Sequence, residues 1–199
     1  MKQRFTLVGI LFLWFILSLD AHAQLRYSLF GGVNVASLRG DDVVREEMPP
    51  RNRTKPGVGI GFSTYNATLL NFRFELVYCE KGARYIGVGD PITHALTCIE
   101  VPALIEYRFD SNDRLIPKLF FGPYFSVNLR SEIHSNGDIT DLKEETMKTE
   151  AGLMLGVGVD CFDRFEIMIR YSWSIRTIHR DQDIDIRTRN VQVFTGILL

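Results

Sequence analysis

The stretch FEIMIRYSW, residues 165–173, alternates strictly between two kinds of position. Its odd positions, from Phe165 to Trp173, are all apolar or aromatic, whereas its even positions include Glu166 and Arg170. Successive side chains of a β-strand point to opposite faces, so this pattern predicts a strand with one apolar face. In a soluble protein that face would form the core. In a membrane barrel it would meet lipid, and the charges would point into the lumen.

Seven further segments show the same period of two, and in each of them one parity is apolar. With the opening stretch extended to residue 175, the eight segments span residues 25–35, 58–62, 72–78, 99–109, 119–129, 151–159, 165–175 and 191–199. No helical periodicity of comparable length is present. The chain is therefore predicted to be all-β with eight strands. Pro102 lies inside the fourth segment and lacks a ladder donor, so a bulge or a local break in pairing is expected there.

The connections between these segments alternate in length. Those at 66–70, 110–116 and 162–164 are short, whereas those that include 38–55 and 132–147 are longer and polar. Short turns at one end and long loops at the other are typical of an up-and-down outer-membrane barrel. A sandwich with Greek-key connections would not produce this alternation.

The residue types on the polar parity indicate whether that face lines a lumen or meets solvent. This parity mixes glycine with bulky side chains. The second segment places Gly57, Gly59 and Gly61 there, and the sixth places Gly152 beside Met154. Glycine weakens an exposed strand, but small and large neighbours are what an eight-stranded lumen needs. We therefore predict an eight-stranded antiparallel up-and-down transmembrane β-barrel, with a soluble lipocalin-like ligand carrier as the alternative.

Charged residues on the polar parity would then lie in the lumen, where burial requires pairing. The predicted lumen ion-pair network comprises Arg26, Arg73, Glu75, Glu100, Glu106, Arg108, Lys118, Arg130, Glu150, Glu166, Arg170 and Arg176. Aromatic residues near strand ends on the lipid face would form the interfacial girdles. The predicted girdle residues are Tyr27, Tyr107, Phe109, Tyr171 and Trp173.

Three cysteines would experience an oxidising compartment. Cys79 and Cys98 share the inward parity of neighbouring strands, and their midpoint falls in the loop between the strands. They are therefore candidates for a disulfide, the alternative being two small buried apolar residues. Cys161 has the outward parity and no candidate partner.

The N-terminus has the layout of a secretory signal peptide. Lys2 and Arg4 precede an apolar run of about 15 residues, which is shorter than the roughly 20 that a spanning helix needs. Ala21-His22-Ala23 supplies the small residues of a cleavage site. We expect cleavage after Ala23, which leaves a barrel domain over residues 24–199.

Composition and motifs exclude several classes of function. The net charge is −1 without a basic stripe, so no nucleic-acid partner is expected. The motifs GxSxG, HExxH and CxxC and the P-loop are absent. We expect no enzyme activity, cofactor or metal.

Five stretches resemble the PorT-like outer-membrane β-barrel family, the outer membrane protein beta-barrel domain found mainly in Bacteroidota. They lie at residues 30–42, 74–85, 98–109, 120–129 and 155–160. The resemblance covers nearly the whole mature chain and implies this kind of barrel rather than an activity. The founding member is similar to an accessory factor for protein secretion and gliding.

Together these patterns predict a non-enzymatic barrel in the outer membrane of a Gram-negative bacterium, with its lumen filled by side chains. It would display the loops at residues 38–55, 84–93, 131–148 and 178–188 to envelope or surface partners. Expected partners are outer-membrane lipid, the outer-membrane assembly machinery and an unidentified surface or periplasmic protein, with the barrel itself monomeric. A small-solute porin is the second alternative, disfavoured because eight strands leave no aqueous channel.

Overall fold

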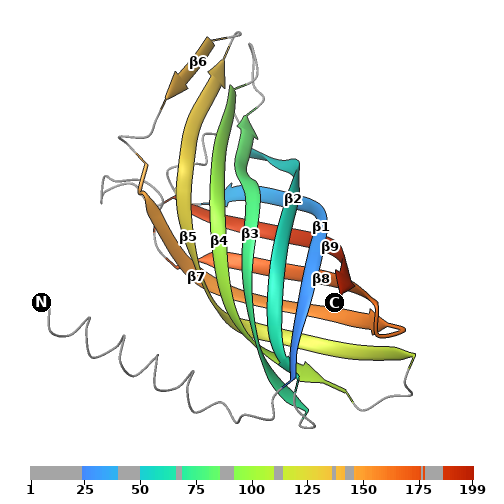
Figure 1. The fold of residues 1–199 in the computed structure, drawn as a ribbon. Helices are drawn as coiled ribbons and strands as arrows, with labels where there is room; N and C mark the ends of the chain where they lie inside the picture. The colour runs from blue at the N-terminus through green and yellow to red at the C-terminus, as the bar shows by residue number, and fades with distance from the viewer. Residues whose placement is uncertain are drawn as a thin grey trace, which may run out of the picture.

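The structure is a computed structural model that describes residues 24–39, 50–65, 69–85, 92–109, 114–135, 138–141, 146–175, 177 and 186–199. Strands account for most of these residues (Figure 1). They are β1 (Gln24–Arg39), β2 (Pro50–Tyr65), β3 (Leu70–Tyr85), β4 (Ile92–Arg108), β5 (Leu115–Ser135), β6 (Asp138–Asp141), β7 (Thr149–Cys161), β8 (Phe165–Ser174) and β9 (Arg187–Leu198). No helix in this part of the chain is long and apolar enough to cross a membrane.

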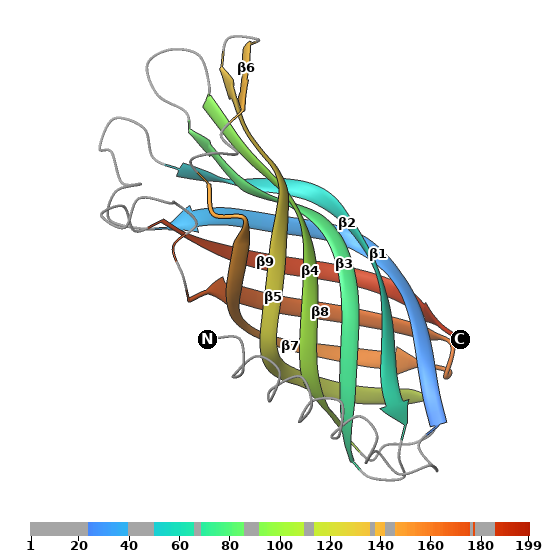
Figure 2. The same ribbon diagram turned by 60° about the vertical axis from the view of Figure 1, so that its left-hand side comes forward.

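Eight of the strands close into a barrel in chain order. Each pairs antiparallel with its neighbours, and β1 pairs with both β2 and β9, which closes the ring β1-β2-β3-β4-β5-β7-β8-β9. Figure 2 shows the same ring from a second side. The predicted eight-stranded antiparallel barrel is confirmed. The short β6, which the periodicity did not predict, extends beyond the ring and pairs with the end of β5.

The two faces of the strands are assigned as the membrane reading predicted. Apolar side chains of the odd positions of β8, such as Phe165 and Ile169, are about half exposed on the outside of the barrel. Glu166 and Arg170 of the same strand are buried. Similar alternation runs along the other seven strands of the ring. An apolar exterior around a charged interior is the inverse of a soluble lipocalin-like carrier.

The short turns agree with the predicted connections. Between β7 and β8 the chain reverses through Phe162–Arg164, where Phe162 and Asp163 have φ of 55° and 54°. Two successive positive φ angles are those of a type I′ turn, whose twist matches that of the flanking strands. A backbone N–H of Arg164 donates to the Cys161 carbonyl at 3.2 Å and closes this turn.

At the opposite, long-loop end the strands continue past the predicted segments. β2 begins at Pro50 rather than near Val58, and β5 runs on to Ser135. A strand needs only about 9–11 residues to cross a bilayer, so these strands extend beyond it. Parts of the predicted loops 38–55, 84–93 and 131–148 are therefore strand, and the predicted loop 178–188 lies mostly outside the described residues.

Two irregularities shape the wall on the β4 side. Around Pro102 the β3–β4 ladder passes from Phe74↔Ala103 to Val77↔Glu100 in unchanged register, which is the local break expected from the missing donor. Between β4 and β5 the register shifts, because Thr97 pairs with Arg130 whereas Cys98 pairs with Asn128. Leu129 is therefore the extra residue of a β-bulge, and the inward parity of β5 changes at this point.

Candidate functional site

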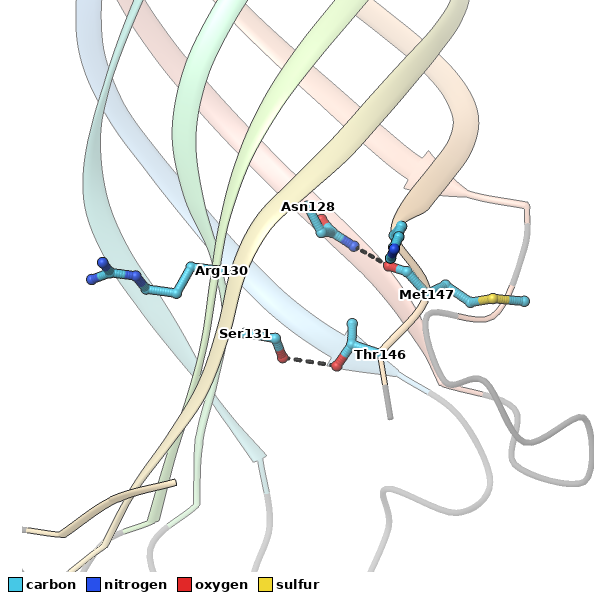
Figure 3. Close-up of a pocket in the computed structure, with 6 residues that line it drawn as sticks. Asn128, Arg130, Ser131, Thr146 and Met147 are labelled. Carbon is cyan, nitrogen blue, oxygen red and sulfur yellow. Dashed lines mark hydrogen bonds between the residues drawn. The ribbon is translucent and has the colours of Figure 1, made fainter. Parts of the chain in front are cut away.

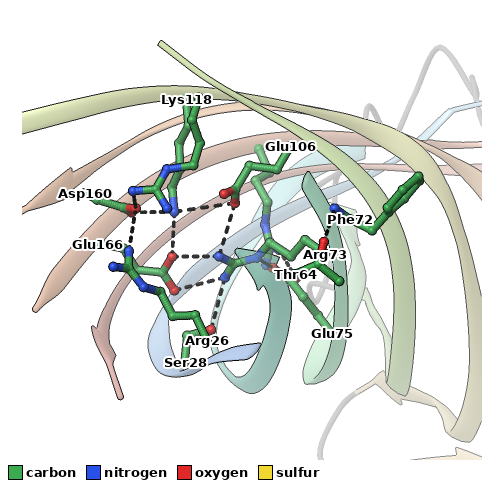
Figure 4. A network of polar contacts seen from close by, with 12 residues as sticks. Arg26, Ser28, Thr64, Phe72, Arg73, Glu75, Glu106, Lys118, Asp160 and Glu166 are labelled. Atoms are coloured by element: carbon green, nitrogen blue, oxygen red, sulfur yellow. Dashed lines mark hydrogen bonds and ion pairs between the residues drawn. The ribbon is translucent and has the colours of Figure 1, made fainter. Parts of the chain in front are cut away.

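Near the short turns, Arg73 on β3 lies at the centre of a cluster of charged side chains in the barrel interior. Its Nε donates to Glu75 Oε1 at 2.6 Å, and its two terminal nitrogens donate to the two carboxylate oxygens of Glu166 at 2.8 and 2.9 Å. Glu106 lies 3.6 Å away and the Ser28 hydroxyl accepts at 3.3 Å. The guanidinium therefore forms a bidentate pair with Glu166, the geometry that arginine favours. Figure 4 shows these side chains converging inside the barrel.

Lys118 on β5 extends this cluster toward the turns. Its ammonium lies 2.5 Å from Asp160 Oδ1, 2.9 Å from Glu166 Oε2 and 3.7 Å from Glu106 Oε2. Asp160 also pairs with Arg108 at 3.2 Å and with Arg26 at 3.5 Å. Each buried carboxylate is thus matched by cations from other strands, as burial of charge requires.

Arg170 on β8 joins the cluster from the other side of the lumen, where it pairs with Glu75. Its guanidinium carbon lies 4.8 Å from the ring centre of Phe194 and 5.4 Å from that of Phe30. Cations over aromatic faces at such distances are attracted by the ring quadrupole. The arginine is therefore held both by a carboxylate and by two rings.

A second cluster lies nearer the long loops and is organised by Lys81 on β3. The ammonium lies 2.7 Å from Glu100 and 3.0 Å from Glu150. The hydroxyls of Tyr124 and Thr188 donate to Glu150 at 2.5 and 2.6 Å. Gln192 donates to Glu100 at 2.9 Å. Hydrogen bonds thus accompany each ion pair of this cluster.

Many of these contacts join opposite walls of the barrel. In the ring order, β3 and β8 are four strands apart in either direction, and so are β4 and β9. Arg73–Glu166 and Arg170–Glu75 join the first pair of strands, and Gln192–Glu100 joins the second. Buried aromatic and methionine side chains occupy the space between the clusters: Phe30, Phe120, Tyr124, Met154, Met168 and Phe194.

Glycines on the inward parity make room for these large side chains. A Cβ on Gly59 would lie 2.6 Å from the ring of Phe30, and one on Gly152 would lie 2.5 Å from the ring of Tyr124. Both distances are too short for a real contact. The small-next-to-large pattern read from the sequence therefore corresponds to individual ring–glycine contacts in the lumen.

One predicted lumen residue lies on the exterior of the barrel, and one lies outside the described residues. Arg130 was assigned inward by the parity of β5, but its side chain is 69% exposed and lies near Glu132. The bulge at Leu129 reverses the faces, so Ser131 points inward instead and is buried. Figure 3 shows Arg130 and Ser131 on opposite sides of β5. Arg176 lies outside the described residues.

Sequence reasoning missed Lys81 and Asp160, which are both central to the clusters. Lys81 has the inward parity of Arg73 and Glu75, and Asp160 has that of Glu150. Extending the alternation past the last apolar position of each segment, by three residues after Tyr78 and by one after Val159, would have found them. The parity signal was present, but the predicted strands ended too early.

The predicted girdle residues lie on the exterior. Tyr107 and Phe109 contact each other edge to face at 4.9 Å near the short turns, with Tyr27 exposed on β1. Tyr171 and Trp173 stack at 5.7 Å in the half of β8 nearer the long loops. Aromatic residues therefore lie toward both ends of the apolar band, where interfacial belts form in membrane barrels.

Cys79 and Cys98 are cross-strand partners on β3 and β4, both fully buried. Their sulfur atoms lie 3.6 Å apart as free thiols. With a Glu100 oxygen they form a set of potential metal ligands within 4.8 Å of one another. Because Glu100 already contacts Lys81 and Gln192, a metal ion there would have to compete with an ammonium group.

A short polar chain lies just inside the long-loop rim. The Ser131 hydroxyl contacts the Thr146 hydroxyl at 2.8 Å and His94 Nε2 at 3.4 Å. Asn128 Nδ2 donates to the Met147 carbonyl at 2.8 Å, as Figure 3 shows. His134, on the outer side of β5, contacts Glu132 at 3.4 Å. Both His94 and His134 thus contact strand residues at the rim.

A closed antiparallel barrel with an apolar exterior and a paired, charged interior defines the class of outer-membrane β-barrel proteins. The chain belongs to the outer membrane protein beta-barrel domain family, whose model matches residues 20–180. Membership places it in the outer membrane of a Gram-negative bacterium. No curated protein matches the sequence.

Several solved structures are similar to this chain. Neisserial surface protein A is 15% identical, with coverage of 86% of this chain and 96% of that chain and a TM-score of 0.50. OprG from Pseudomonas aeruginosa is 11% identical, with coverage of 89% and 97% and a TM-score of 0.50. The outer membrane enzyme PagL is 10% identical, with coverage of 87% and 99% and a TM-score of 0.47. At such identities the likeness concerns the fold alone.

Proposed function

We propose that this protein is a non-enzymatic integral outer-membrane barrel whose lumen is closed by its own side chains and whose long loops contact envelope or surface partners. The observation that carries this proposal is the set of ion pairs between opposite walls, above all Arg73–Glu166 and Arg170–Glu75. A solute would have to separate several buried pairs to pass, and each separation would leave charges unpaired in a dry interior.

Planar-bilayer recording tests the closed lumen. The folded barrel, reconstituted at a protein density verified on unheated gels, should give no conductance above that of the protein-free bilayer. The runner-up function, a small-solute porin, predicts discrete conductance steps that persist across preparations. Such steps would overturn the closed-lumen proposal.

The absence of catalysis is proposed from the rim geometry. In the described part of the rim, the Ser131 hydroxyl lies 3.4 Å from His94 Nε2, but Ser131 is only 2% exposed. A nucleophile and its base ordinarily lie about 2.6–3.2 Å apart and must be reachable by substrate. Incubation of the folded barrel with phospholipid or lipid A vesicles should therefore release no fatty acid, and release that depends on Ser131 would contradict the proposal.

A role accessory to protein secretion is suggested by the resemblance to the PorT-like family. Photo-crosslinkers placed in the loops 38–55 and 131–148 should capture an envelope or surface protein in intact cells. Crosslinkers at the lipid-facing Ile60 provide the matched background. Capture of the same proteins from both kinds of position would count against loop-mediated recognition.

Export through the inner membrane is proposed to remove the leader. Intact-mass measurement of the protein purified from outer membranes should give a chain that begins at Gln24, with the barrel domain 24–199 retained. A mass that includes residues 1–23 would show that the leader stays attached. The barrel is expected to be a monomer after assembly by the outer-membrane assembly machinery.

A further inference from the structure

Exposed cations gather at the long-loop edge of the apolar exterior. The described members are Arg51, Arg84, Arg130, Lys148, Arg187 and Arg189. We propose that the cations at this edge, the basic rim, bind the phosphate groups of an anionic lipid of the outer leaflet. The proposal rests on the proposed function, with the long loops facing the cell exterior as in outer-membrane barrels generally.

The level of the basic rim is fixed by its cross-strand neighbours. Arg189 on β9 pairs directly with Trp173 on β8, an aromatic residue of the exterior. Two residues further along β9 the lipid-facing apolar positions begin with Val191. Tryptophan side chains mark the boundary between hydrocarbon and headgroups. Arg189 therefore lies where the headgroup of a lipid packed against β8 and β9 would lie.

Around the ring, Arg130 and Lys148 occupy the corresponding edge between β5 and β7. Arg130 directly follows the exposed Leu129, and the bulge at that residue turns the arginine outward. Lys148 stands beside Asn128, two residues before Arg130, since its carbonyl accepts from the backbone N–H of Asn128 at 2.9 Å. Two exposed cations, one on β5 and one immediately before β7, thus border the apolar band. The bulge that invalidated the lumen assignment of Arg130 is what supplies this outward charge.

A groove of about 510 Å³ continues the basic rim across β2–β5. It is lined by Asn52, Arg53, Thr54, Lys55, Arg84, Thr93 and His134. It lies where the β2–β3 register shifts between Asn52 and Gly57. Arg84 pairs with Thr93, and Thr93 pairs with His134, so these three form a row across β3, β4 and β5.

Among the described residues at this groove, cations outnumber carboxylates. Glu80 contacts Arg53 at 3.0 Å and Lys55 at 3.8 Å, Arg84 adds a third cation, and Glu132 contacts His134 at 3.4 Å. Arginine forks and lysine ammonium groups are the side chains that bind phosphate oxygens. A phosphate-bearing headgroup would place negative charge beside these cations. A lipid is favoured over a soluble polyanion because the basic rim borders the lipid-facing band and does not lie only on loop tips.

The test uses the full-length folded barrel in detergent micelles and native mass spectrometry. The probes are diphosphorylated lipid A and the same glycolipid after enzymatic removal of its phosphates. The rim variant combines Arg84→Gln, Arg130→Gln, Lys148→Gln and Arg189→Gln. The matched control, Arg114→Gln with Arg164→Gln, removes two exposed cations from the opposite end.

Each basic side chain near an anionic surface contributes about fivefold to binding. The wild type should therefore bind the phosphorylated lipid at least about tenfold more tightly than the dephosphorylated one. The rim variant should lose this preference and the control should keep it. Because all four rim positions are exposed, the variant should fold; if it does not, the pairs Arg130→Gln/Lys148→Gln and Arg84→Gln/Arg189→Gln are measured separately.

Three outcomes would overturn the proposal: equal binding of both lipids by the wild type, equal loss in rim variant and control, or preferential binding of a soluble sulfated oligosaccharide to the same rim. The last would assign the basic rim to a polyanionic glycan. None of these results bears on conductance. The proposal of a closed lumen and the proposal of lipid binding are therefore tested separately.

Discussion

At the scale of single residues, the free energy of unfolding should depend on Arg73 in the lumen more than on any exposed cation. Arg73→Met would leave Glu75, Glu106 and Glu166 short of a buried partner. Loss of one partner from a buried ion pair costs about 3–5 kcal/mol, so the free energy of unfolding should fall by that amount. Urea titration in detergent micelles, followed by intrinsic fluorescence, measures it.

The control for this change is Arg130→Met, at a similar side chain on the exterior. Its free energy of unfolding should stay within about 0.5 kcal/mol of the wild type, as is usual for surface substitutions. Adding Glu166→Gln to Arg73→Met should recover part of the loss, because it removes the negative charge of a carboxylate that has lost one of its two cations. Equal destabilisation by Arg73→Met and Arg130→Met would show that the lumen pairs contribute nothing specific.

Glycine is required at position 59 because neighbouring atoms leave no room for a side chain, and not because of its own backbone conformation. In Gly59→Val the new side chain would collide with Phe30, and its Cβ would also approach the Leu76 carbonyl at 2.9 Å. Overpacking of this kind costs about 1–3 kcal/mol. Gly31→Val is the matched control, since an ideal Cβ there lies 3.5 Å from its nearest atom. The same urea titration should separate the two variants, and a similar loss in both would refute the ring–glycine account.

At the scale of the strand pair, Cys79 and Cys98 can join β3 to β4 covalently. Because they face each other and the protein is exported through an oxidising compartment, we expect them to be linked in protein from outer membranes. Alkylation after unfolding in SDS should then label only Cys161. Reduction before alkylation should label all three cysteines, and Cys79→Ser should expose Cys98 without reduction. Three labels in the unreduced wild type would show that the pair stays as thiols.

The strands themselves were predictable because their signal is local. Alternation places each side chain from its immediate neighbours, so β8 and the glycine-rich face of β7 follow from the sequence alone. Arg130 was misplaced because a bulge depends on how two strands pair, which no single segment reveals. β6 was missed because its four residues are all exposed and have no apolar face.

The pairing within the lumen was less predictable than its composition. Which carboxylate meets Arg73 depends on the strand stagger of the closed barrel, and Glu166 is 93 residues away in sequence. Lys81 and Asp160 were not predicted as lumen residues because the last apolar position was taken as the end of each segment. The charged residues beyond that position continue the inward parity. Charge on the polar parity is therefore part of the strand signal in such barrels.

At the scale of the whole molecule, closure of β1 on β9 leaves the barrel ring without a free edge strand. Unfolding then has to open a continuous ladder together with the lumen pairs. The protein should therefore require detergent for extraction from the membrane fraction. On SDS gels an unheated sample should migrate as a compact species that shifts to a slower mobility after boiling.

The temperature at which the mobility shifts reports how far the lumen ion pairs stabilise the closed barrel. If the ion pairs between opposite walls hold the ring closed, Arg73→Met should convert at a lower temperature than the wild type, whereas Arg130→Met should convert with it. The measurement is a series of samples heated in SDS at increasing temperature before electrophoresis. Identical mobility with and without heating, or recovery of the protein in a detergent-free extract, would contradict the membrane-barrel assignment. If the mobility shifts on heating but the temperature of the shift does not depend on Arg73, the membrane-barrel assignment stands and only the role of the lumen network is wrong.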